Sequence, residues 1–154
     1  MRELERLSEL EALQGEEIGV GEWMEVTQHQ IDLFADATGD HQWIHVDPER
    51  AAKGPFGATI AHGFLTLSLL PKLVESTLRV ADVKMGVNYG LNRVRFTSPV
   101  PAGSMLRART RLLKYEPLEV ASGYGAQVTT EVTIEMKGAD RPACVAESIG
   151  RRYA

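Results

Sequence analysis

The sequence predicts an α+β fold in which helices come first along the chain and an antiparallel β-sheet follows. Helix signals, meaning capping residues and apolar residues three or four apart, are confined to the part before about Ala81. Beyond Ala81, β-branched residues alternate with polar ones in four segments that glycines and prolines separate: 87–100, 105–113, 126–136 and 144–153. Because these strands are grouped rather than interleaved with helices, a parallel βαβ sheet is disfavoured.

Residues 1–20 predict a helical extension at the start of a single domain that spans 1–154. Leucines recur there at every third position among Glu and Arg, at Leu4, Leu7, Leu10 and Leu13. This spacing is typical of a short amphipathic helix, and Gly15 is placed to end it.

The next elements are predicted from their capping residues. After a brief strand at 23–26, Thr27 and Gln30 have the spacing of a capping box and predict a helix that Gly39 stops. Pro48 suits the first position of a further short helix. The segment between Gly39 and Pro48 is therefore predicted to be a loop.

The stretch 58–78 is apolar nearly all the way round, which is typical of a buried helix. Pro71 should kink or divide it, and His62 and Gly63 lie near its start. One buried helix wrapped by an antiparallel sheet is the simplest packing for this order of elements.

Composition excludes several classes of protein. The 154 residues are 44% hydrophobic and 25% charged, as in an ordinary soluble globular protein. The net charge of −4 argues against nucleic acid or an anionic membrane surface as the main partner. The single cysteine, Cys144, allows no intrachain disulfide and indicates a reducing compartment. The charged N-terminus is not a signal peptide and no apolar run could span a bilayer, so we expect a cytoplasmic protein without a membrane partner.

The loop T-G-D-H-Q-W-I-H-V-D-P, residues 38–48, concentrates the ionisable side chains, and a metal site is one interpretation. His41 and His45 are four residues apart and Asp47 would add an oxygen ligand. Such a histidine pair chelates well on a helix, which Gly39 and Pro48 disfavour here, and no glutamate stands between the two histidines. We therefore predict no metal.

Two interpretations of the loop remain open from the residues alone. In the first, Asp40 caps the turn, His45 bonds a backbone carbonyl, Asp47 caps the next helix and His41 is exposed to solvent. In the second, Asp40 and His45 hold a water molecule between them as a catalytic acid–base pair.

The pattern F-A-D-A-T-G-D-x-x-x-x-H-x-D, followed by A-H-G-F, resembles the hydratase-2 motif of the MaoC-like dehydratases, a family that includes the (R)-specific enoyl-CoA hydratases. Further on, N-R-V-R-F-T-S-P-V-P-A-G-S-M-L is similar to the family's F-x-x-P-V-x-x-G signature. The resemblance runs from about Thr27 to the C-terminus and is good for the NodN-like branch.

The resemblance implies a hot-dog fold, a long helix wrapped by an antiparallel sheet, and a homodimer with its sites near the interface. It places the catalytic pair on Asp40 and His45 and an oxyanion-binding N–H on Gly63. His62, in the same motif, is assigned to substrate binding. The implied activity is that of a hydro-lyase: reversible hydration of a trans-2-enoyl-CoA to an (R)-3-hydroxyacyl-CoA, with no metal or redox cofactor.

The chain departs from the family at Gln42 and Trp43, where Asn-Pro is common. Gln42 keeps an amide that could orient water or His45, and Trp43 could line the pocket, so both are assigned to substrate binding. Candidate walls of the acyl pocket are Ile60, Phe64 and Leu67, for which core packing is the simpler role. Two roles are open for Arg93, Arg95 and Arg107. They could bind the phosphates of coenzyme A, or they could simply form the solvent-exposed face of a strand, which is the simpler role.

Two rival functions remain. A hot-dog thioesterase would not need the Asp-x4-His pair, so the motif disfavours it. A non-catalytic subunit that binds acyl thioesters is the other, and the replacement at Gln42 and Trp43 leaves it open.

Overall fold

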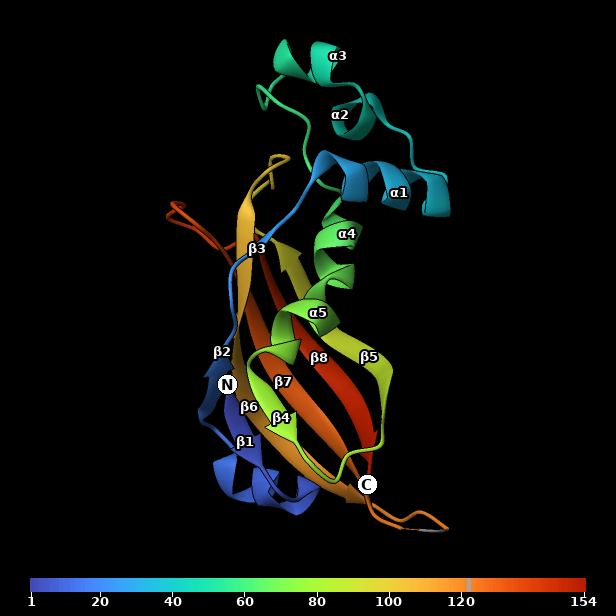
Figure 1. Cartoon of the computed structure of the whole chain (residues 1–154), viewed down its shortest axis with the longest axis vertical. Coiled ribbons are helices and arrows are strands. Elements are labelled where there is room, and N and C mark those ends of the chain that lie inside the picture. The colour runs from blue at the N-terminus through green and yellow to red at the C-terminus, as the bar shows by residue number, and fades with distance from the viewer. Residues whose placement is uncertain (122) are drawn as a thin grey trace.

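A strongly curved antiparallel sheet carries the second half of the chain in this computed structural model, which describes residues 1–121 and 123–154 (Figure 1). Within these residues the main sheet has six strands in the order β2-β6-β7-β8-β5, with β3 pairing to β6. Its strands are β2 (Glu17–Val20), β3 (Met24–Glu25), β5 (Met85–Phe96), β6 (Met105–Leu118), β7 (Gly125–Met136) and β8 (Cys144–Tyr153). A two-stranded parallel sheet joins β1 (Arg2–Leu4) to β4 (Leu78–Val80).

The helices precede the long strands, as predicted. They are η1 (Leu7–Leu13), α1 (Gln28–Thr38), α2 (Trp43–Val46), α3 (Pro48–Ala52), α4 (Gly63–Ser68) and α5 (Leu70–Glu75). In Figure 1, α1, α2 and α3 gather at one end of the molecule, while α4 and α5 descend along the sheet. The α+β hot-dog architecture predicted from the sequence is confirmed.

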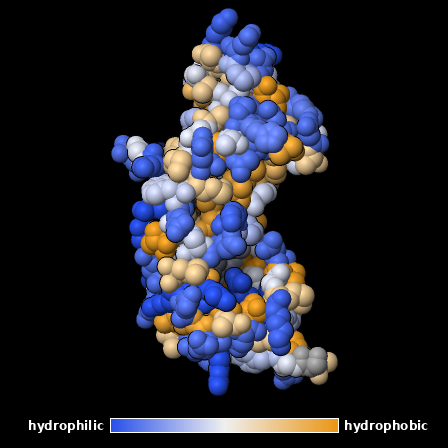
Figure 2. Space-filling view, viewed as in Figure 1, coloured by the Kyte–Doolittle hydropathy of each residue, from blue (hydrophilic) through white to orange (hydrophobic). Residues whose placement is uncertain are grey.

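Pro71 divides the predicted central helix. Proline has no N–H to donate to the carbonyl of Leu67, so α4 ends at Ser68 and α5 begins at Leu70, with Leu69 between them. Leu65 and Leu73 are buried against the sheet, but Phe64 is 70% exposed. Hydrophilic side chains cover much of the α1–α3 end in Figure 2, and hydrophobic ones show along the middle of the molecule. The helix is therefore buried on one side only.

Local capping signals are confirmed. Thr27 Oγ1 accepts the N–H of Gln30 at 3.2 Å, and Gln30 Oε1 accepts the N–H of Thr27 at 2.9 Å. Gly39 ends α1 with φ of 78°, a left-handed conformation that glycine adopts without strain. The Asp47 carboxylate caps α3 by accepting the N–H of Arg50 at 3.0 Å, with Pro48 at its first turn.

The N-terminal segment is less helical than predicted. Leu7–Leu13 forms a 3₁₀ helix, and short strands flank it on both sides. A 3₁₀ helix has three residues per turn, so leucines at every third position fall on one face. Leu7 and Leu10 are buried in one of two apolar clusters, together with Ile18 and Leu112. The other cluster packs α1, α4 and α5 against the sheet.

The long strand β5 forms one edge of the main sheet. β5 pairs with β8 alone among the described strands, and its side chains are largely exposed. Large apolar side chains on this edge are exposed at Met85, Val87, Tyr89, Leu91 and Phe96. No helix within the described residues is long and apolar enough to cross a membrane.

Candidate active site

Three ionisable side chains converge at the helical end of the molecule. Asp40 follows α1, His45 lies on α2 and His62 precedes α4, and one nitrogen or oxygen of each lies within 4.8 Å of the others. Both histidines are buried, whereas Asp40 is exposed. The structure thus brings together the two residues that the sequence predicts as a pair and adds His62 to them.

The chain turns sharply to make this arrangement. The left-handed Gly39 reverses it after α1, and the Asp40 carboxylate accepts the N–H of Gln42 at 3.3 Å. The next residues form one helical turn, because His45 N–H bonds to the Gln42 carbonyl at 2.9 Å and Asp47 N–H to the Trp43 carbonyl at 3.1 Å. The prediction of a loop throughout this segment is therefore wrong for Trp43–Val46.

Hydrogen bonds determine the orientation of His45. Its Nδ1 lies 2.7 Å from the carbonyl oxygen of Ile60, which can only accept, so Nδ1 carries the proton. In the neutral tautomer that this bond favours, the lone pair is on Nε2. The backbone is fixed as well, because Gln28 Nε2 donates to the His45 carbonyl at 2.8 Å while Gln28 Oε1 accepts the Thr59 hydroxyl. His45 therefore presents a basic nitrogen from a rigid support.

His62 is held in the same manner. Its Nε2 lies 3.0 Å from the carbonyl oxygen of Asp40 and must donate to it, so Nδ1 carries the lone pair. This Nδ1 is buried and has no hydrogen-bond partner in the described part of the chain. The ring stacks on His45 with centroids 3.8 Å apart and planes at 23°, and Phe34 packs on it at 4.9 Å. The contact to Asp40 also fixes the position of the turn that follows α1.

The same three residues are a conceivable ligand set, but their geometry fits a metal poorly. An imidazole binds a metal along a lone pair that lies in the ring plane, at about 2.0–2.1 Å. Because the rings of His45 and His62 are stacked, their in-plane lone pairs do not converge on one point between them. The metal set considered from the sequence does not assemble: His41 bonds Asp36 at 2.9 Å, and Asp47 caps α3.

Gly63 is the first residue of α4, so its N–H has no partner within the helix. A Cβ at this position would lie 2.9 Å from Cδ2 of Phe96. Only glycine allows the Phe96 ring, at the end of the edge strand β5, to pack against the start of α4. The predicted oxyanion donor therefore lies beside the sheet edge.

Among the described residues, neither the side chain of Gln42 nor that of Trp43 forms a hydrogen bond with His45. The Gln42 side chain is exposed and makes no hydrogen bond within the described residues, while Ile60 fills the role predicted for it in orienting His45. The Trp43 ring faces α3, where the Arg50 guanidinium stacks on it at 4.4 Å and Gly54 packs against its edge. Their assignment to substrate binding stays a prediction.

The residues predicted to form the walls of the acyl pocket, and the arginines predicted to bind phosphates, differ in their burial and in their partners. Ile60 is buried and Leu67 packs on the apolar core, while Phe64 is exposed. Arg107 is occupied, because it pairs with Glu135 at 2.6 Å and stacks on Trp23. Arg93 and Arg95 are exposed on β5.

Sequence reasoning missed Gln28 altogether. It lies 17 residues before His45, in the first turn of α1, where a polar residue gives no functional signal. The unpaired Nδ1 of His62 was also missed, although the H-G pair at the start of the apolar stretch marked the position.

The sequence and fold of this chain are similar to those of known proteins. Residues 9–135 match the family profile of the MaoC-like domain. The chain belongs to the MaoC-like family. A curated MaoC-like relative, 3-hydroxyacyl-thioester dehydratase Z of Mycobacterium tuberculosis, is 55% identical over 155 residues and covers 100% of both chains. Nodulation protein N of Rhizobium leguminosarum bv. viciae is 53% identical over 138 residues, covering 88% of this chain and 83% of its own.

Solved MaoC-like structures share the fold. The MaoC-like dehydratase from Rhodospirillum rubrum superposes with a TM-score of 0.74 at 22% identity, covering 96% of each chain. The (R)-hydratase from A. caviae involved in PHA biosynthesis gives 0.66 at 23% identity, covering 89% of this chain and 97% of its own.

Proposed function

We propose that this protein catalyses the reversible addition of water to a trans-2-enoyl-CoA, giving the (R)-3-hydroxyacyl-CoA. The observation that carries the proposal is the juxtaposition of the Asp40 carboxylate with the imidazole of His45, whose Nδ1 donates to the Ile60 carbonyl. A carboxylate and a neutral imidazole can both accept hydrogen bonds from one water molecule, which orients the oxygen for attack. The names of the relatives, a 3-hydroxyacyl-thioester dehydratase and an (R)-hydratase, support the same reaction.

The steps of this reaction follow from the atoms available. Asp40 and His45 hold the water, and its oxygen forms a bond to C3 of the enoyl thioester while the pair takes up a proton. Electron density moves from the C2–C3 double bond toward the thioester oxygen, where the Gly63 N–H stabilises the enolate. The same pair returns a proton to C2, so the product contains all the atoms of the water. The bond from His45 Nδ1 to Ile60 keeps the imidazole oriented in both states.

We also propose a homodimer that forms through the edge strand β5. An exposed edge of twelve residues that carries large apolar side chains is a ready surface for pairing with a second copy. Phe96 on this strand packs against Gly63, so a partner on β5 would lie next to the site. Arg93 and Arg95, exposed on the same strand, would then be available to the coenzyme A phosphates. We also propose that residues 1–20 are part of a single domain spanning 1–154, which the pairing of β2 with β6 supports.

The test is to add crotonyl-CoA and follow the ultraviolet absorbance of its conjugated thioester. Loss of this absorbance without release of free thiol, in the presence of a chelator, is the expected result. Thiol release would instead identify a thioesterase. An unchanged absorbance with short and long acyl chains would leave a non-catalytic acyl-thioester-binding subunit and refute hydration.

A further inference from the structure

Asp40 is held less firmly than His45. Its N–H lies 3.5 Å from Thr38 Oγ1, and its carboxylate accepts the N–H of Gln42 at 3.3 Å. Both of these bonds are long, and both join residues only two positions apart. Among the described residues, the one hydrogen bond that joins Asp40 to a distant segment runs from His62 Nε2 to its carbonyl oxygen, at 3.0 Å. The position of Asp40 relative to the core therefore depends on His62.

His62 itself has a firm support. Its carbonyl oxygen accepts the N–H of Thr66 at 3.1 Å within α4, and the preceding Ala61 donates its N–H to the carbonyl of Val100 at 2.7 Å. The His62 side chain is only 3% exposed. The donor that reaches Asp40 is therefore fixed at the head of a helix.

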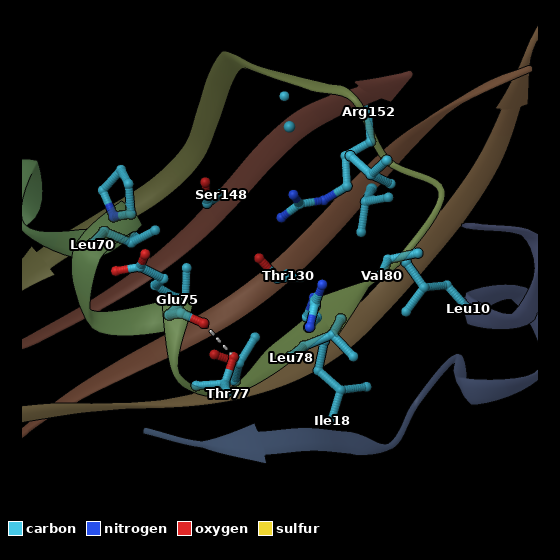
Figure 3. A pocket seen from close by; sticks show the side chains of 18 of the residues that line it. Leu10, Ile18, Leu70, Glu75, Thr77, Leu78, Val80, Thr130, Ser148 and Arg152 are labelled. Carbon is cyan, nitrogen blue, oxygen red and sulfur yellow. Dashed lines mark hydrogen bonds between the residues drawn. The ribbon is translucent and has the colours of Figure 1, made fainter. Parts of the chain in front are cut away.

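The helical segment that follows His62 is anchored in turn. Leu65 of α4 and Leu73 of α5 are buried in the apolar cluster that packs against the sheet. Figure 3 shows the far end of this segment, where the Thr77 hydroxyl donates to the carbonyl of Val74 at 2.7 Å beside a cavity. The bond from His62 thus joins the exposed turn after α1 to a part of the chain that is fixed in the core.

The geometry of the Asp40 and His45 pair leaves little freedom. One ligand atom of each residue lies within 4.8 Å of that of the other. Two acceptors that share one water molecule, each at about 2.8 Å from its oxygen, lie about 4.5 Å apart. A misplacement of about 1 Å can lower a catalytic rate about 100-fold. A contact that fixes Asp40 should therefore affect any reaction in which the pair shares one water molecule.

We propose that His62 is a positioning residue for hydration, and that it acts through Asp40 by donating its Nε2–H to the Asp40 carbonyl. The stacking of its ring on that of His45, with centroids 3.8 Å apart, places both members of the pair against the same side chain. This inference rests on the hydration proposed above. The role needs no bond from His62 to the substrate.

Three variants of His62 separate the donor from the ring. His62→Gln places an amide N–H near the position of Nε2, His62→Asn carries the same group one carbon shorter, and His62→Phe keeps a ring without a donor. We expect His62→Gln to keep kcat for crotonyl-CoA within about threefold of the wild type. His62→Asn and His62→Phe should lower kcat by about 10–100-fold and change KM less than about twofold. Equal kcat values for His62→Gln and His62→Phe would overturn the proposal.

A double variant tests whether the effect passes through Asp40. Added to Asp40→Asn, His62→Phe should lower kcat by less than about a further twofold, because the carboxylate that it positions is already gone. A further loss as large as in the wild-type background would contradict the proposal. Thr38→Val is the matched control, since it removes only the local 3.5 Å bond to Asp40 and should leave kcat within about twofold of the wild type. A loss equal to that of His62→Phe would remove the special role of the long-range bond.

Long-range ¹H–¹⁵N NMR of the wild-type chain tests the hydrogen bond without any measurement of activity. We expect His62 to carry its proton on Nε2 and His45 on Nδ1, since each of these atoms faces a carbonyl oxygen. A proton on Nδ1 of His62 would overturn the proposal even if none of the variants folds. A chain that shows the expected tautomers but hydrates no enoyl-CoA would refute the proposed function with the inferred bond intact. Hydration by a chain with the proton of His62 on Nδ1 would refute the positioning role alone.

Discussion

The helical end and the sheet end of this molecule differ in what they bury. The helical end buries polar side chains, His45, Thr59 and His62, each hydrogen-bonded to another segment of the chain. The cluster at the sheet end, around Leu10 and Leu112, is apolar, and the charges on the strands there pair on the outer surface. Buried polar groups fix orientation, whereas apolar burial supplies stability.

Under the proposed function, activity and stability depend largely on separate ends of the molecule. Substitutions in the Asp40 cluster should lower the rate with little effect on folding. Substitutions in the apolar cluster around Leu10 and Leu112 should lower the free energy of unfolding with little effect on the rate. The predictions below test this separation.

The largest effect is expected at the helical end. Asp40→Asn and His45→Gln should each lower kcat for crotonyl-CoA hydration by about 10²–10⁴-fold, because each removes a group that holds or accepts the proton of water. The thermal midpoint of Asp40→Asn should change little, since its side chain is exposed. Retention of more than a tenth of the wild-type kcat by either variant would contradict the assignment.

Leu112→Ala should have the opposite profile. Leu112 is fully buried, so its truncation should cost about 2–5 kcal/mol of unfolding free energy and lower Tm by roughly 4–20 °C. Hydration by the folded variant at 25 °C should stay within about twofold of the wild type. The neighbouring Leu113→Ala is the matched control, because that side chain is 36% exposed and should change Tm much less. A large loss of kcat in Leu112→Ala would show that the two ends are coupled.

The edge strand β5 runs beside both ends, and its role in assembly can be tested by charge. Leu91→Lys places an ammonium on the exposed apolar edge and should raise the dimer Kd at least about tenfold, measured by sedimentation. Leu33→Lys, on an exposed position of α1, should leave assembly unchanged. A wild-type chain that sediments as a monomer would refute the dimer.

The smallest effect concerns His41, which is exposed and pairs with Asp36. The hydrogen bond to Asp36 raises the pKa of His41, so the pair stabilises the fold at low pH and loses this contribution as pH rises through that pKa. His41→Ala should therefore lower Tm slightly at pH 5.5 and not at pH 8.5, with kcat unchanged. A fall in kcat would draw His41 into the chemistry.

Features that depend on neighbours along the chain could be predicted from the sequence. The capping box at Thr27 and Gln30 and the strand at 144–153 were found because short-range hydrogen bonding and alternation determine them. Long-range contacts could not be predicted. The bond from His45 to Ile60, the stacking of His62 on His45 and the packing of Phe96 on Gly63 all depend on how distant segments pack, which spacing does not encode. The leucine repeat predicts a short amphipathic helix but not its type, because a three-residue repeat suits both α and 3₁₀ geometry.

The absence of a side chain at Gly63 links the proposed oxyanion donor to the proposed dimer edge, because Phe96 of β5 packs against this glycine. Because the Phe96 ring fills the space where a side chain at residue 63 would stand, any larger residue there must displace this ring at the end of β5. Replacing Phe96 to reshape the proposed acyl site would also alter β5, the strand proposed to pair with a second copy. Redesigning β5 would in turn alter the packing against Gly63, the proposed oxyanion donor.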